Sequence, residues 1–138
     1  MSESRCSVPV RYSDGTMGVA TVICTEEVSK DGVEVTMSFD RSFELKAVSE
    51  RGIFDAVRQI RTQLDREHVL LMCFAADEAV YPSPMQESMG LSSLAYRNRL
   101  GRQAMNADIV DIFEADESIN PVTVDQQAEF HRRWLESL

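Results

Sequence analysis

Carboxylates are the residues of this sequence most able to do chemistry, since 23 Asp and Glu stand against 14 Lys and Arg. Two or more carboxylates that converge can act as acid and base or hold a divalent metal. The close pairs are Asp77 with Glu78, Asp108 with Asp111, and Asp116 with Glu117. The stretch from Asp111 to Glu117 lacks the central glycine of an EF-hand loop, so solvated charge without a metal or cofactor is the favoured interpretation. A carboxylate-dependent hydrolase, with its site near Asp77, Glu78 and Asp111, is the alternative.

Neither the histidines nor the cysteines follow a pattern typical of metal binding or nucleophilic catalysis. His68 and His131 have no ligand-type neighbour at the spacing of HxxxH or HExxH, and no serine lies in a GxSxG context. Cys6, Cys24 and Cys73 are widely spaced in apolar runs and form no CxxC motif. Free buried thiols are typical of a reducing compartment, so we expect a cytoplasmic protein. Because the sequence has no catalytic motif of these kinds, we also expect a protein that is not an enzyme.

Negative charge is both abundant and unevenly distributed along the chain. The formal net charge is −9, which disfavours nucleic acid and anionic membranes and favours a basic protein as partner. From Gln103 to His131 there are seven acidic residues and no Lys or Arg, directly after the basic residues Arg97, Arg99 and Arg102. We therefore expect an acidic face that binds a basic protein, with a merely solubilising surface as the alternative.

The stretch from Val80 to Leu100 combines methionines and tyrosines with small residues, a composition typical of adaptable contact surfaces. Tyr81 and Tyr96 are its best contact candidates, because tyrosine is enriched at interfaces. Together with the carboxylates they complete the predicted partner-binding set: Asp77, Glu78, Tyr81, Tyr96, Asp108, Asp111, Asp116 and Glu117.

The segments YPSPMQESMGLSSLAYRNRLGRQA and DIVDIF resemble part of the immunity proteins encoded beside bacterial polymorphic toxins. The resemblance covers the middle and C-terminal half of the chain. It implies a cytosolic inhibitor that occludes the active site of a cognate toxin, and it assigns no individual functional residue. A third possibility is a homodimeric structural or assembly adaptor that pairs through an exposed edge strand or through the helix carrying Phe130 and Trp134.

Length and composition predict one folded unit. With 138 residues and 43% hydrophobic residues, we expect a single globular domain over 1–138 in which residues 1–4 are flexible. No run approaches 18 apolar residues, and the N-terminus lacks the apolar region of a signal peptide, so no membrane span is expected.

The first third of the chain alternates apolar and polar residues and predicts a β-meander. Its strands are Arg5–Tyr12, Met17–Val28 and Val33–Phe39. Two-residue turns at Asp14-Gly15 and Asp31-Gly32 would place opposite faces of the middle strand in the core. A bulge in the second turn or near Thr25–Glu27 would remove this conflict. Pro9 places the first strand at an edge.

The remaining elements alternate helices and strands. Ile53, Val57, Ile60 and Leu64 form an apolar stripe that predicts a helix over Glu50–Glu67, capped by Ser49. The later elements are a buried strand over Val69–Ala76, a helix from Pro84 to about Leu100 with Ser83 as N-cap, a strand over Ile109–Phe113 and a helix from the Thr123 capping box to Leu138. The expected class is α+β: a mixed, mainly antiparallel sheet in βββ-α-β-α-β-α order with helices mostly on one face.

Overall fold

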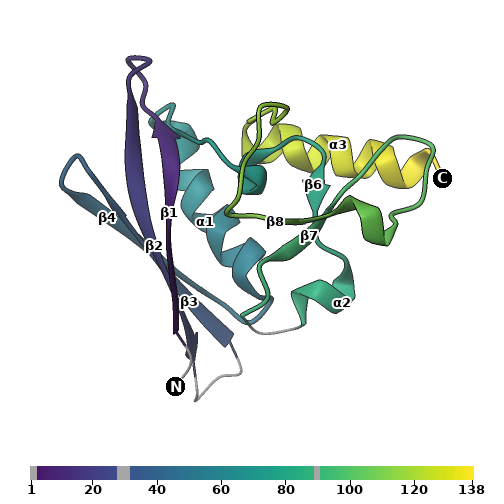
Figure 1. The fold of residues 1–138 in the computed structure, drawn as a ribbon, viewed down its shortest axis with the longest axis horizontal. Coiled ribbons are helices and arrows are strands. Elements are labelled where there is room, and N and C mark those ends of the chain that lie inside the picture. Colours follow the sequence, from purple (N-terminus) through teal and green to yellow (C-terminus); the bar gives the residue numbers. More distant parts are fainter. Residues whose placement is uncertain (1–2, 28–31, 89–90) are drawn as a thin grey trace.

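The strands of the computed structural model form two antiparallel sheets, and helix α1 (Ile53–Arg66) lies between them (Figure 1). The structure describes residues 3–27, 32–88 and 91–138. The larger sheet has the order β4-β3-β2-β1-β5, with β1 Glu3–Arg11, β2 Met17–Glu27, β3 Gly32–Phe39, β4 Phe43–Ser49 and β5 Leu70–Leu71. The smaller sheet has the order β6-β7-β8, with β6 Val80–Tyr81, β7 Leu94–Arg97 and β8 Ile109–Asp111. The predicted α+β class is confirmed, but the strands make two sheets instead of one, and every pairing among the described residues is antiparallel.

The alternation that predicted the meander is also the pattern of burial. Along β3, Val33, Val35, Met37 and Phe39 are buried, and their side chains face α1. The strand β4 extends the meander, although the sequence analysis did not predict it. Its residues Leu45, Ala47 and Ser49 alternate with exposed ones, the pattern of a strand with one covered face.

The first hairpin explains the register of the middle strand. The N–H of Tyr12 donates to the carbonyl of Thr16 at 2.9 Å, and Gly15 has φ +84°. The turn thus holds three residues, with glycine in the left-handed position, and is one residue longer than predicted. As a result Val10 lies opposite Gly18. The even-numbered residues of β2 therefore face the core in the pairing with β1 and in the pairing with β3 alike.

One of the two predicted positions for a bulge was therefore wrong. The pairing of β2 with β3 is regular from Ala20 to Glu27, so no bulge occurs near Thr25–Glu27. The predicted second turn at Asp31-Gly32 falls partly on residues 28–31, which lie outside the described residues. The prediction that Pro9 places the first strand at an edge holds only in part. In the described chain β1 has β5 on its outer side, but the two pair only at Val10 and Arg11, and the Pro9 carbonyl accepts the N–H of Met72 at 2.8 Å.

Helix α1 carries the predicted apolar stripe, and its four residues are all buried. The predicted N-cap was wrong. Gly52 takes that position with φ +97°, and a Cβ there would lie 2.7 Å from the carbonyl oxygen of Glu87. Ser49 instead ends β4, where its hydroxyl donates to Asp55 at 2.7 Å and accepts the N–H of Arg51.

The segments after α1 differ most from expectation. The stretch Val69–Ala76 is buried except for Leu70 and Met72, which are half-buried. Only β5 is a strand, and a 3-10 helix, η1 (Phe74–Ala76), follows it. Ser83 does cap a helix, α2, but this helix spans only Pro84–Glu87. The predicted continuation to Leu100 is wrong because β7 pairs there with β6 and β8, which buries Ala95.

The C-terminal helix α3 spans Val124–Glu136 and begins, as predicted, at a capping box of Thr123 and Gln126. A second 3-10 helix, η2 (Asn106–Asp108), leads into β8. None of the described helices is long and apolar enough to cross a lipid bilayer.

Candidate functional site

Asp77, a predicted contact residue, is enclosed in the fold with 1% of its surface exposed. Its carboxylate pairs with the guanidinium of Arg97 at 3.1 Å and accepts the N–H groups of Ala79 and Asn120, each at 2.9 Å. Buried carboxylates need such partners, and these tie the segment after η1 to β7 and to the residues before α3. Asp77 is thus a structural residue and offers a partner no accessible surface.

The carboxylates of the hydrolase alternative are not brought together. Asp111 lines a hollow beside β1 with Arg5, Cys6 and Glu114, and Asp77 does not line it. In the part of the chain that the structure describes, no three His, Cys, Asp or Glu side chains are placed to share a metal ion. This geometry gives no support to a carboxylate-based active site at Asp77, Glu78 and Asp111.

The cysteines are free thiols, as predicted. Burial raises the pKa of Cys24 and of Cys73 to about 11, and burial followed by the charge of Asp111 raises the pKa of Cys6. Because the thiolate is the reactive form, these shifts leave the thiols unreactive at neutral pH.

Three of the predicted contact residues share one face of the smaller sheet. Tyr81 lies directly opposite Tyr96, Tyr96 lies opposite Ile109, and Leu94 lies opposite Asp111. Directly opposed and alternate residues of a sheet project to the same side. Tyr81, Tyr96 and Asp111 therefore lie on one surface with Leu94 and Ile109, whose exposed fractions are 43% and 36%.

A pocket of about 380 Å³ opens on this face between β6, β7, α2 and α3, and we call it the aromatic pocket. Tyr81, Tyr96, His131 and Trp134 line it, together with Glu87 and Asn98. His131, Trp134 and Asn98 were not predicted as contact residues from the sequence. The signal that could have revealed two of them is the i, i+3 spacing of His131 and Trp134, which places them on neighbouring positions of one helix face.

The aromatic side chains of the pocket form a stack. The rings of Tyr81 and His131 are 3.8 Å apart and 11° from parallel, and the His131 and Trp134 rings are 5.7 Å apart. Phe54 lies against Tyr81 at 5.2 Å, and Arg58 donates a 2.7 Å hydrogen bond to the Tyr81 hydroxyl. Tyr81 is thus held on several sides and forms a wall of the pocket, so it is not a projecting anchor.

The segment between β7 and η2 closes the pocket because the end of α3 holds it. The indole N–H of Trp134 donates to the carbonyl of Arg102 at 2.9 Å, and the N–H of Gly101 donates to the Ser137 hydroxyl at 2.7 Å. Gly101 has φ +80°, a backbone conformation that glycine adopts without strain.

Two buried polar atoms of the pocket residues lack partners in the described part of the chain: Oδ1 of Asn98 and Nδ1 of His131. Asn98 is only 5% exposed, so its amide is largely removed from water. Burial lowers the pKa of His131, the charge of Glu87 opposes this effect, and the charge of Arg58 adds to it. His131 is consequently neutral at pH 7.

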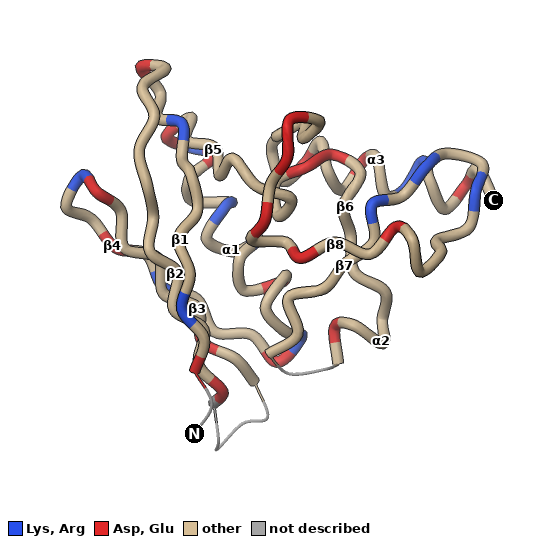
Figure 2. The backbone as a smooth tube through the Cα atoms, in the orientation of Figure 1, with Lys and Arg blue, Asp and Glu red and all other residues tan. Residues whose placement is uncertain are grey.

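Part of the predicted acidic stretch forms an acidic loop, which we define as residues 111–117. Figure 2 shows acidic segments following one another from β8 through this loop, whereas basic segments gather near the C-terminus. Asp111 accepts the N–H of Phe113 at 2.9 Å, and Asp116 accepts the N–H of Ser118 at 2.8 Å. Hydrogen bonds from the hydroxyl and the N–H of Ser118 lower the pKa of Asp116, so this exposed carboxylate is charged at neutral pH.

The other predicted residues lie around this loop. Glu117 is exposed, while Glu78 and Asp108 are half-buried, and Asp108 accepts the N–H of Met105 at 3.0 Å. Arg97 fastens the end of the loop by donating to the hydroxyl and the carbonyl of Ser118, each at 2.7 Å.

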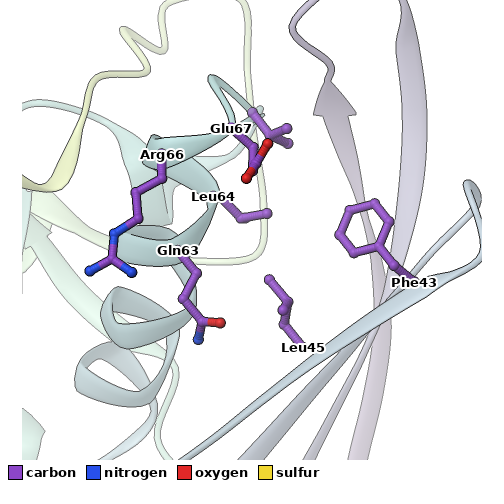
Figure 3. Close-up of a pocket in the computed structure, with 7 residues that line it drawn as sticks. Phe43, Leu45, Gln63, Leu64, Arg66 and Glu67 are labelled. Atoms are coloured by element: carbon purple, nitrogen blue, oxygen red, sulfur yellow. The ribbon is translucent and has the colours of Figure 1, made fainter.

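A second hollow lies on the other side of the molecule, between β4 and the end of α1. Figure 3 shows Phe43 and Leu45 pointing from β4 toward the helix, with Gln63 and Glu67 on the helical side. Phe43 stacks on Phe39 with ring centroids 4.3 Å apart. No predicted contact residue lines this hollow.

No protein-family model and no curated protein matches this sequence. The fold and the chemistry of the surface are therefore the basis for assigning a function. On that surface, residues of the smaller sheet line the aromatic pocket, and the acidic loop begins at the end of the last strand of this sheet.

Proposed function

We propose that this protein is a protein-binding module of the immunity type, which holds a basic bacterial toxin domain and occludes its active site. The observation that supports this proposal most is the acidic loop, in which Asp111 and Asp116 are held by hydrogen bonds from Phe113 and from the adjoining Ser118. A charged surface that is already ordered loses little conformational entropy when a partner docks on it.

The neighbouring sheet face supplies the apolar area that such an interface needs. Leu94 and Ile109 are exposed on it, and Met105 is exposed nearby in the sequence. Specific interfaces combine an apolar or aromatic centre with a polar rim, and opposite charges mainly speed encounter and fix orientation. The sheet face and the acidic loop offer these two components side by side in the chain.

The edge of the larger sheet favours this proposal over a homodimer through β4. Within the described residues β4 pairs only with β3, and exposed Phe43 and Val48 lie along it. The exposed Glu44 and Lys46 lie on the same strand, however, and charges on an edge strand oppose pairing with a second copy.

The test is protection of a bacterial host from a toxin. Each gene that flanks the coding sequence of this protein is expressed in the host, alone and together with it. We expect one neighbour to arrest growth, the protein to restore growth, and the purified pair to form a stable complex. If no neighbour is toxic, or if co-expression leaves the arrest unchanged, the immunity proposal is wrong.

Charge reversal locates the contact surface. The double variant Asp116→Lys with Glu117→Lys should slow association about ten-fold or more at low salt, because the attraction that steers a basic partner is lost. The matched control is Glu26→Lys with Glu50→Lys, which reverses two exposed carboxylates outside the acidic loop. Equal slowing by both pairs would contradict the assignment of the loop as the contact surface.

A further inference from the structure

The aromatic pocket has the chemistry of a receptor for a planar cation. We propose that it binds the guanidinium side chain of an arginine that the basic partner inserts between Tyr96, Trp134 and Asn98. This inference rests on the proposed function, because it names the anchor by which that partner is held.

The first observation is the pair of unpartnered polar atoms. Buried polar groups are almost always hydrogen-bonded. A buried polar group without a partner lowers the stability of the folded protein, because it has lost its hydrogen bonds to water and gained none in return. Asn98 lines the pocket, is more than nine-tenths buried, and its Oδ1 has no partner in the described chain. Neutral His131 can accept a hydrogen bond at Nδ1 when its proton is on Nε2. Both atoms are closed off from solvent in the free protein, so the N–H groups of a ligand would satisfy them once the Asn98 and His131 side chains shift toward the pocket.

The second observation is the charge of the surroundings. Among the described residues, those that line the pocket include Glu87, which also pairs with Arg51 at 3.0 Å outside the lining, and no Lys or Arg. Aromatic faces attract cations through their negative π-face, most strongly when the cation leaves water. Arg58 already uses this chemistry from within the protein, since its guanidinium carbon lies 5.8 Å from the Tyr81 ring centroid while it bonds the hydroxyl.

The shape of the pocket favours arginine over lysine. A guanidinium is planar, stacks on aromatic rings and donates several hydrogen bonds in fixed directions, whereas an ammonium is a compact, strongly hydrated charge. A pocket of about 380 Å³ with ring walls and separate acceptors suits the planar group. Trp134 and Tyr96 are the rings available to it, because His131 covers Tyr81.

Asn98 connects this pocket to the acidic side chains. It also lines a neighbouring hollow with Asp108, Asp116, Arg97 and Arg99, of which Arg97 is already paired with Asp77. An arginine drawn toward these carboxylates would therefore meet the pocket on the other side of Asn98. Attraction over a distance and anchoring in a pocket are then two steps of one binding event.

The test uses Trp134, the single tryptophan of the chain, as a built-in probe. Its fluorescence is followed while the intact protein is titrated with N-acetyl-arginine methylamide, and separately with the citrulline analogue, which has the same shape but no charge. We expect a saturable change with arginine and about ten-fold weaker binding of citrulline. Equal binding of both compounds, or no saturable change, would overturn the proposal.

A pair of asparagine variants identifies the acceptor. Asn98→Leu should weaken arginine binding about ten-fold, yet leave the melting temperature unchanged or higher, because it removes a buried oxygen that has no partner. The matched control Asn106→Ala, at an exposed position outside the pocket, should bind as the unmodified protein does. If Asn98→Leu unfolds the protein or binds arginine normally, the unpartnered amide is not a ligand-binding group.

The outcomes separate this inference from the proposed function. Arginine binding without protection from any neighbouring toxin would support the pocket and reject the immunity role. Protection that Asn98→Leu leaves unchanged would support the immunity role and reject the pocket as the anchor.

Discussion

The larger sheet and α1 meet through apolar side chains, whereas α3 joins the molecule through buried polar ones. In the first region Val22, Met37 and Ile60 have no exposed surface and lie in a continuous apolar core. In the second region the one fully buried side chain of α3 is Gln127, whose amide nitrogen donates to the carbonyls of Ala75, Asp77 and Val80. Arg61 completes this polar network from α1, although no ion pair among the described residues includes it.

This difference affects how each region responds to change. Apolar burial is non-directional, so a core of this kind loses stability in proportion to the volume removed. A buried polar network depends on every member, because each lost partner leaves another group unsatisfied. Since α3 carries His131 and Trp134, the aromatic pocket depends on the polar network, while Tyr81 joins it to the apolar core through Phe54.

The largest expected effect comes from Arg61→Leu. This change leaves the Gln127 side-chain oxygen and the Val122 carbonyl without a donor and removes one of the two donors to the Ala75 carbonyl, so the free energy of unfolding should fall by about 3–5 kcal/mol. Denaturant titration measures the loss, and Trp134 fluorescence should shift to the red before the main transition as α3 detaches. Arg66→Leu, an exposed position on the same helix, is the control and should change stability by less than about 0.5 kcal/mol. A similar loss in both variants would contradict the network.

A smaller loss, about 2–4 kcal/mol, is expected for Met37→Ala in the core of the larger sheet. Here Trp134 fluorescence in the folded state should stay unchanged, because the cavity forms away from α3. Circular dichroism and tryptophan fluorescence should then report the same transition. If Met37→Ala releases Trp134 at low denaturant, the two regions are not held independently.

Gln127→Leu sharpens the comparison within α3. The side chain keeps its approximate size but removes the donor to the Val80 carbonyl and the acceptor of Arg61, while the carbonyls of Ala75 and Asp77 keep Arg61 and the Val80 N–H as donors. A loss of about 2 kcal/mol is therefore expected. Arginine binding, followed as above, should weaken along with stability because α3 forms a wall of the pocket. The control Gln103→Leu, at an exposed position, should alter neither property.

The apolar region was also the one that could be predicted from sequence. The alternation in β3 and the stripe of α1 depend only on local periodicity, and both were confirmed. Arg61 and Gln127 could not be recognised, because a polar residue on a helix looks solvent-exposed until distant carbonyls are known to face it. The helix predicted after Pro84 failed for the same reason: β7 exists through its pairing with β6 and β8, which sequence periodicity does not report.

The candidate site was predictable in its parts but not in its assembly. Tyr81 and Tyr96 were chosen separately for their residue type, and only the register of β6 with β7 places them opposite each other. Asp77 was chosen for its charge, but Arg97 and two backbone N–H groups enclose it. Asn98 carried no signal, because an unpartnered amide is defined by the atoms around it.

The smallest expected effect is the pH dependence that His131 adds to stability. Burial holds the pKa of folded His131 below its ordinary value of 6.5, with the charge of Glu87 opposing the shift and that of Arg58 adding to it. Above pH 6.5 both folded and unfolded chains have a neutral imidazole, and the stability is complete. As the pH falls below 6.5 the unfolded chain binds the proton first, so stability declines until the folded pKa is passed.

Melting temperatures between pH 7.5 and 5 should therefore fall more for the unmodified protein than for His131→Phe, which keeps an aromatic ring against Tyr81. His68→Gln, at an exposed position, should retain the full decline. Equal declines in all three proteins would show that the stack of His131 between Tyr81 and Trp134 tolerates the charged ring, and a pocket that accepts an internal cation so readily would not need one from a partner.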